Sequence, residues 1–219
     1  SAALVRDDAV FGPTSPIRGA RWRLEAGRTL GELAHGTLLV DARRYLYLRP
    51  VTLAVRGFHF GRYGANADVP QFAPLSLGDG MLVRGYRADT FSPADYTVDP
   101  TRPGVCPEQA RLFGSRLAAT SVELRLPLTG ARGLSLVGRG PGLELAPFAD
   151  AGVAWTGREG PEFSAGQLFE RGALGRVPVV SAGVAARLNL RSIIVEAFWA
   201  RPFQREGSGI FGLNLSPGW

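Results

Sequence analysis

The sequence contains no lysine, so its positive charge comes from arginine alone. Its 25 basic residues stand against 19 acidic residues and give a formal net charge of +6. Nucleic-acid-binding proteins gather such charge in a basic patch or stripe. Here the arginines are spread along the chain and alternate with apolar residues. We therefore expect no nucleic-acid partner.

Long hydrophobic runs are also missing. No stretch approaches the roughly 18 to 20 consecutive apolar residues that a membrane-spanning helix needs, which excludes a helical membrane protein. A β-barrel is compatible with the mean hydropathy of +0.03, because only alternate residues of its strands face lipid. With 45% hydrophobic and 20% charged residues, the chain is too apolar to be disordered.

Residues that carry most catalytic and metal chemistry are scarce. The single cysteine, Cys106, excludes a disulfide framework within the chain, and we expect it to be an unpaired loop thiol. The two histidines, His35 and His59, have no cysteine or carboxylate at metal-ligand spacing. The sequence lacks a G-x-S-x-G elbow and a P-loop. We therefore expect no catalytic site, metal or cofactor, and the enzymatic alternative is an outer-membrane hydrolase that uses a serine and His59.

The dominant pattern is a strict alternation of apolar with small or polar residues, which is typical of β-strands. In the last segment, one face is wholly apolar and comprises Phe211, Leu213, Leu215, Pro217 and Trp219. The same period predicts about nine strands. They cover residues 2–11, 21–30, 37–48, 51–64, 115–128, 143–155, 180–190, 193–203 and 211–219. Most have the about 9 to 14 residues of tilted membrane-spanning strands, whereas soluble sheets usually have about 5 to 6.

The connections between these segments alternate in length. Those at 48–50 and 190–192 are very short, whereas 65–114 and 156–178 are long. Two further connections on the short side, 12–20 and 129–141, are somewhat longer. Short turns on one side and long loops on the other are typical of outer-membrane barrels, whose long loops are extracellular.

The tryptophans fit the same interpretation. All four alternate in step with the apolar residues of their strands, so they lie on the apolar face; they are Trp22, Trp155, Trp199 and Trp219. Several of them stand near strand ends, as an aromatic belt at the lipid interface requires. The alternative is a soluble β-sandwich binding module whose core they would fill. Such a sandwich needs shorter strands with more frequent turns.

Two carboxylates, Glu123 and Asp150, lie on the strand face opposite the apolar residues. In a barrel they would point into the lumen, where an unpaired charge costs several kcal/mol. Strand neighbours such as Arg125 and Arg187 are possible partners. Another is Arg84, if the long loop that carries it folds inward.

Three ordered motifs resemble one known family. Val83-Arg84-Gly85-Tyr86 is similar to the V-R-G-F/Y signature of the outer-membrane assembly-factor and bacterial surface antigen superfamily, to which the BamA, TamA and FhaC barrels belong. Residues 114–128 resemble the strand after the signature loop, and Pro147–Gly152 resembles the F-x-D-x-G strand that follows. Residues 200–203 and the aromatic C-terminus are similar to the last two strands.

The resemblance covers nearly the whole chain and implies its fold. It implies an all-β chain in which residues 1–219 form one outer-membrane domain, an antiparallel transmembrane β-barrel that matches the last nine of sixteen strands. Because closed bacterial barrels have an even number of strands, we expect missing strands before Ser1. The resemblance implies that the POTRA domains of the family are missing there as well. No cleavable signal peptide is present, and the chain opens within a strand-like segment. Residues 11–19 also resemble a branch in which a propeller or another domain precedes the barrel.

The resemblance also implies a site. The loop 65–114 would fold into the lumen, where Arg84 would bind Asp150 and Glu123 and its guanidinium would pack on Phe148. Gly85 would permit a tight turn, and Tyr86 would pack on the wall. Together with Val83, these are the expected site residues.

The implied function is insertion of proteins into the outer membrane, or transport across it. The expected partners are outer-membrane lipid, client polypeptides and the barrel-assembly machinery. That machinery would recognise the terminal strand through Phe211, Leu213, Leu215 and Trp219. The alternative is a passive outer-membrane anchor for an N-terminal domain outside this chain.

Overall fold

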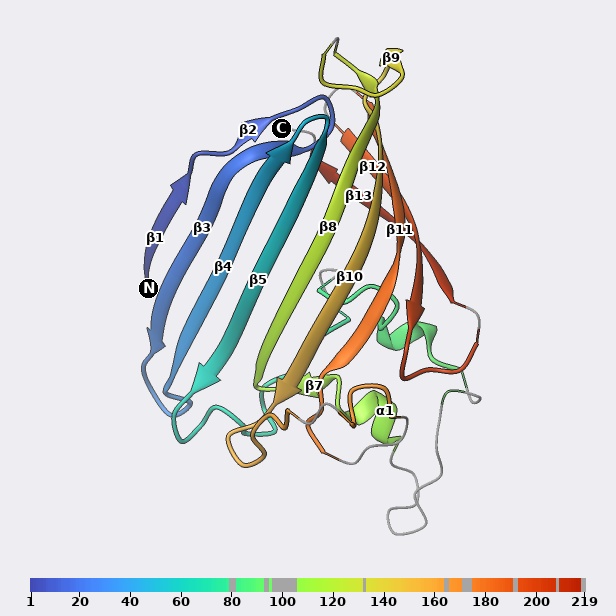
Figure 1. Cartoon of the computed structure of the whole chain (residues 1–219). Helices are drawn as coiled ribbons and strands as arrows, with labels where there is room; N and C mark the ends of the chain where they lie inside the picture. The colour runs from blue at the N-terminus through green and yellow to red at the C-terminus, as the bar shows by residue number, and fades with distance from the viewer. Residues whose placement is uncertain are drawn as a thin grey trace.

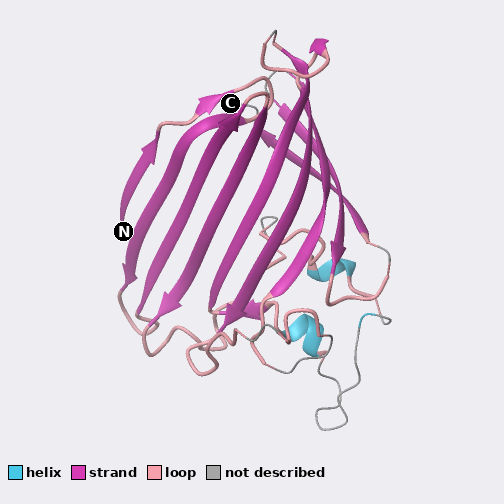
Figure 2. Cartoon of the chain, in the orientation of Figure 1, coloured by secondary structure: helices cyan, strands magenta, loops and turns pink. Residues whose placement is uncertain are grey.

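The computed structural model of the chain describes residues 1–78, 82–92, 95, 106–131, 133–163, 166–170, 175–190, 193–207 and 209–217. Almost all of its regular structure is β-strand (Figure 2). The prediction of an all-β, antiparallel fold is therefore confirmed. No helix among the described residues is long and apolar enough to cross a membrane.

Nine strands lie side by side and form the backbone of one 11-stranded sheet, which is strongly curved (Figure 1). In spatial order they are β1 (Ala2–Asp7), β3 (Pro16–Thr29), β4 (His35–Leu48), β5 (Val51–Tyr63), β8 (Arg116–Gly130), β10 (Leu143–Trp155), β11 (Val179–Leu190), β12 (Ile193–Pro202) and β13 (Ile210–Pro217). All neighbours along this path are antiparallel. Two short strands complete the sheet: β2 (Val10–Phe11) pairs with β3, and β9 (Gly138–Arg139) pairs with β8.

The observed strands agree with the predicted segments, with two corrections at the N-terminal end. The predicted strand 2–11 is interrupted after Asp7, and β3 begins at Pro16, five positions before the predicted start at Arg21. Proline and glycine suggested a turn in 16–20. However, Pro16 opens the strand, where a missing N–H is tolerated, and Gly19 pairs with Tyr45 of β4.

The long connections gather at one end of the sheet, the lower end in Figure 1. They follow β5 and β10, and the shorter connection after β12 lies at the same end. The described residues of the first connection include four short elements: β6 (Leu75–Ser76), the 3-10 helix η2 (Ala88–Thr90), α1 (Pro107–Ala110) and β7 (Phe113–Gly114). β6 and β7 pair with each other, and Cys106 is a free thiol directly before α1.

The strand register places the apolar residues and the small or polar residues that alternate with them on opposite faces of the sheet. On one face, which we call the outer face, large apolar side chains are exposed; Phe211, Leu213 and Leu215 of β13 are 82%, 71% and 70% exposed. Trp199 lies on the same face, opposite Phe211. Trp219 is outside the described residues. An apolar surface of this extent on regular strands is what a lipid-facing wall requires.

The other face, which we call the inner face, carries the polar residues and both buried clusters. One cluster joins the long connection after β5 to β8, β10 and β11, and comprises Leu77, Val83, Tyr86, Leu112, Leu117, Ala119, Ala154 and Val179. The second lies on β10, β11 and β12 and comprises Ala146, Phe148, Ala185, Phe198 and Ala200. The inner face is therefore packed against the chain's own loop rather than against a second sheet.

Candidate functional site

Two neighbouring strands bring the acidic residues together on the inner face. In the antiparallel register of β8 and β10, Asp150 lies opposite Ser121, and Glu123 lies opposite Phe148. Residues two apart on a strand share a face, so all four side chains project to the same side. This places two carboxylates and an aromatic ring within reach of one incoming residue.

Arg84 occupies that position. Its Nε donates to Asp150 Oδ2 at 2.8 Å and its Nη2 to Asp150 Oδ1 at 2.9 Å, which makes a bidentate pair. The backbone N–H of Arg84 donates to the same Oδ2 at 3.2 Å, and Nη2 also reaches Ser121 Oγ at 3.3 Å. The remaining nitrogen, Nη1, lies 2.9 Å from Glu123 Oε1. The guanidinium therefore uses its whole planar fork, which lysine does not possess.

Because the ion pairs of Arg84 are buried, they are costly to break. The side chains of Arg84 and Asp150 are 5% and 1% exposed, and the guanidinium carbon lies 3.4 Å from the centre of the Phe148 ring. A desolvated cation on an aromatic face is stabilised by about 2 kcal/mol. Removing one partner of a buried pair costs about 3–5 kcal/mol, because the other charge is left without compensation.

Two glycines allow the loop to reach the wall. Gly85 has a φ of +91°, a left-handed conformation that side chains disfavour. A Cβ added to Gly152 would lie 2.6 Å from Val83 Cγ2 and 2.9 Å from Leu77 Cδ2. Gly152 therefore leaves the space on β10 that the loop fills.

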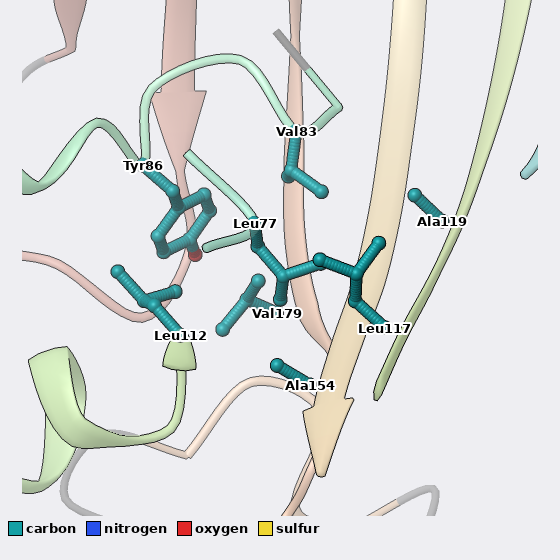
Figure 3. Packing of buried hydrophobic residues seen from close by; sticks show 8 residues of the cluster. All are labelled: Leu77, Val83, Tyr86, Leu112, Leu117, Ala119, Ala154 and Val179. Carbon is teal, nitrogen blue, oxygen red and sulfur yellow. The ribbon is translucent and has the colours of Figure 1, made fainter. Parts of the chain in front are cut away.

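Val83 and Tyr86, on either side of this turn, belong to the same buried cluster (Figure 3). Both side chains are 1% exposed. The Tyr86 hydroxyl lies 3.0 Å from the Val180 carbonyl and bonds the side-chain carbonyl of Gln204. Burial raises the pKa of Tyr86 to about 12, so the phenol stays protonated at neutral pH.

The carboxylates belong to a wider network that sequence reasoning resolved only in part. Glu123 is shared by Arg84, Arg125 and Arg187, so the alternative pairing also exists for this residue. Arg187 further contacts Glu196 at 2.5 Å and Glu144 at 3.1 Å. The roles of these two glutamates were not anticipated. Both stand on the inward parity of their strands, which was the signal available for finding them.

The network adjoins a cavity of about 350 Å³ on the inner face. Its walls come from strands at both ends of the sheet, from Arg21 on β3 to Asn214 on β13, and Arg84 and Glu123 also contribute. The inner face is therefore concave and polar, and the loop carrying Arg84 lies within it.

The remaining expected residues lie elsewhere. Phe211, Leu213 and Leu215 point away from the network, on the outer face of β13. His59 contacts the Tyr63 hydroxyl at 2.6 Å and stacks on Trp155, and among the described residues no serine forms a hydrogen bond with His59. The described part of the chain contains no group of three potential metal ligands among its histidine, cysteine and acidic side chains.

Comparisons with known proteins agree with this fold. The structure of BamA from Haemophilus ducreyi lacking POTRA domains 1–3 superposes with a TM-score of 0.65 at 16% sequence identity. The match covers 98% of this chain and 41% of that one, so the chain spans less than half the length of this relative. No curated protein matches in sequence.

The family model gives the assignment. The resemblance rested on three ordered sequence motifs, and it implied an antiparallel sheet with an apolar outer face and a V-R-G-Y loop bound to its inner face. The model of the Omp85 superfamily domain matches residues 6–209, which is most of the chain. The chain therefore belongs to the Omp85 superfamily.

Proposed function

We propose that this chain forms part of an outer-membrane β-barrel that aids the insertion of proteins into the membrane or their transport across it. Superfamily membership supports the general role. The single observation that carries the proposal is the buried bond between Arg84 and Asp150. It holds a long loop inside the concave face, which in a closed barrel is the lumen.

In this proposal the loop has a structural role, which is to bind the inner wall and fill the lumen, and it has no catalytic role. The described residues around Arg84 enter the lumen from the extracellular side, and the tip at Arg84 fixes them to the wall made by β8 and β10. An occupied lumen keeps the barrel from being an open pore. Because the bonds at the tip are charge-assisted and geometrically specific, the loop has one defined docked position.

The strands near the C-terminal end favour insertion at that side. β13 is the last strand in the order of the sheet and has a hydrogen-bonded neighbour, β12, on one side only among the described residues. An edge strand with unpaired backbone N–H and C=O groups can pair with an incoming strand, and thinning of the adjoining bilayer at this edge would lower the barrier to insertion. The seam that includes β13 is therefore the proposed site of client entry.

The proposed partners follow from this role. They are outer-membrane lipid on the outer face, client polypeptides at the seam, and the barrel-assembly machinery that inserts the protein itself. The apolar residues Phe211, Leu213 and Leu215 would serve as lipid contacts and as part of the assembly signal. The proposal includes no enzymatic step and no nucleic-acid partner.

The experiment is a reconstitution with a matched pair of variants. The full gene product that contains this chain is placed in liposomes of phosphatidylcholine, and insertion of an unfolded outer-membrane barrel protein is timed. We expect Arg84→Ala to slow insertion and Arg87→Ala to leave it unchanged, because Arg87 is exposed and pairs only with the exposed Asp89 among the described residues.

Equal rates for the parent protein, both variants and empty liposomes would contradict the proposal. That outcome would favour the alternative of a passive anchor. Depletion of the protein in its host would then leave the amounts of other outer-membrane barrels unchanged.

A further inference from the structure

The loop tip has a second attachment, made by the connection between β12 and β13. Arg205 from this connection has a side chain that is 3% exposed. Its Nη1 donates to the Gly85 carbonyl at 2.7 Å and to Thr90 Oγ1 at 2.9 Å, and its Nη2 donates to the Thr90 carbonyl at 2.6 Å. One arginine thus bonds the turn of the tip and the short helix η2 that follows it.

Asp95 completes the attachment. Arg205 Nε and Nη2 each lie 3.1 Å from a different oxygen of the Asp95 carboxylate. The carboxylate is held from its other side by the backbone N–H of Ser92 at 2.8 Å and by its hydroxyl at 2.9 Å. The guanidinium lies 3.8 Å from the centre of the Phe91 ring. Arg205 therefore occupies a built pocket in which every nitrogen is used.

The neighbouring residue makes a parallel contact. Gln204 is fully buried and its side-chain carbonyl bonds the Tyr86 hydroxyl and accepts from the Val180 N–H at 3.0 Å. The Gln204 N–H donates to the Tyr86 hydroxyl at 3.3 Å. Two consecutive residues of the β12–β13 connection therefore hold two consecutive residues of the tip.

We propose that Arg205 is a positioning residue that couples the loop tip to the last strand pair. Arg84 fixes the tip to β8 and β10, and Arg205 fixes it to the hairpin that leads into β13. A displacement of β13 would then pull on the same tip that Arg84 holds. This inference deepens the proposed function, on which it rests, by naming the link between the lumen loop and the seam.

The test measures a distance and needs no client protein. In the full gene product reconstituted in phosphatidylcholine vesicles, with Cys106→Ser, spin labels are attached at positions 89 and 213. Both parent side chains are exposed, Asp89 at 62% and Leu213 at 71%. We expect a narrow distribution of distances between the two labels in the parent protein. In Arg205→Gln we expect this distribution to become broad.

Arg176→Gln is the matched control. Arg176 bonds the same long connection at its base, through the carbonyls of Ala110 and Phe113, and comes from the connection after β10. It should leave the distance narrow. Arg205→Lys should recover part of the narrow population, because the ammonium keeps the charge opposite Asp95 but lacks the fork.

An unchanged distribution in Arg205→Gln, or an equal broadening in Arg176→Gln, would overturn the proposal. If Arg205→Gln fails to fold, Asp95→Asn provides the same readout with a smaller change. Because the distance is measured without transport, failure here is distinct from failure of the proposed function, which the insertion assay with Arg84→Ala reports.

Discussion

Arg84 and Asp150 are joined by three hydrogen bonds, two from the guanidinium at 2.8 and 2.9 Å and one from the backbone N–H at 3.2 Å. The third bond fixes the backbone of the loop as well as the side chain. A surface ion pair is worth little, whereas this one is almost fully buried and leaves a costly charge behind if broken. The docked position of the loop therefore depends on it.

Replacing Arg84 with alanine should release the tip. The loss of the partner of the buried Asp150 costs about 3–5 kcal/mol, and protease should then cleave the loop faster. Arg84→Lys should give an intermediate rate, since the charge remains without the fork. Limited proteolysis in bilayers measures this, with Arg87→Ala as the control. Unchanged protection of the loop in Arg84→Ala would contradict the account.

A methyl group at Gly152 should also displace the loop. The new Cβ would stand 2.6 Å from Val83 Cγ2, and overpacking of this kind costs about 1–3 kcal/mol. The control is Gly57→Ala on β5, where an added Cβ meets nothing within 4 Å. Thermal unfolding should show a lower midpoint for Gly152→Ala only. Equal midpoints for the two variants would mean that the loop does not pack on β10.

Stability should fall at high pH through Tyr86. Its folded pKa is raised to about 12 by burial, against about 10 in an unfolded chain. Folding therefore favours the protonated phenol, and this contribution is complete below pH 10 and lost as the pH rises through 12. Tyr86→Phe should remove this part of the alkaline destabilisation. An identical pH profile of unfolding in both proteins would rule out the assignment to Tyr86.

The two faces of β13 should respond in opposite ways to a charge. Leu213 is exposed on the outer face, whereas Asn214 lines the inner cavity. An arginine facing lipid near the bilayer midplane costs roughly 2–4 kcal/mol, so Leu213→Arg should reduce the fraction of protein that resists extraction from membranes. Asn214→Arg should be tolerated. The reverse result would exchange the assigned faces.

Sequence reasoning was sufficient for the strands and their faces because a period of two is local. β10 has the predicted bounds, Leu143–Trp155, and Asp150 faces inward as its parity required. Deviations occurred at Pro16–Ala20, where residues typical of turns lie in a strand that pairs with β2 on one side and β4 on the other. Pattern alone does not report such pairing.

Strand periodicity placed the carboxylates of the site on the inner face, but the choice of Arg84 as their partner came from the resemblance. The contact between Arg84 and Asp150 was expected from the family motifs. The network around Arg187 required the registers of four strands, and Arg205 required the path of two loops. Loop residues do not alternate between two faces as strand residues do, so the contact partner of a loop side chain cannot be predicted from its position in the sequence.

The most direct test of the account is a double-mutant cycle between Arg84 and Asp150. Hydrogen exchange of residues 82–92 is measured in lipid bilayers for the parent protein, Arg84→Gln, Asp150→Asn and the double variant. We predict slow exchange in the parent and a strong increase in each single variant. The double variant should show little further increase, because both changes break the same bond. Fast exchange in the parent, or effects that simply add, would contradict the docked loop.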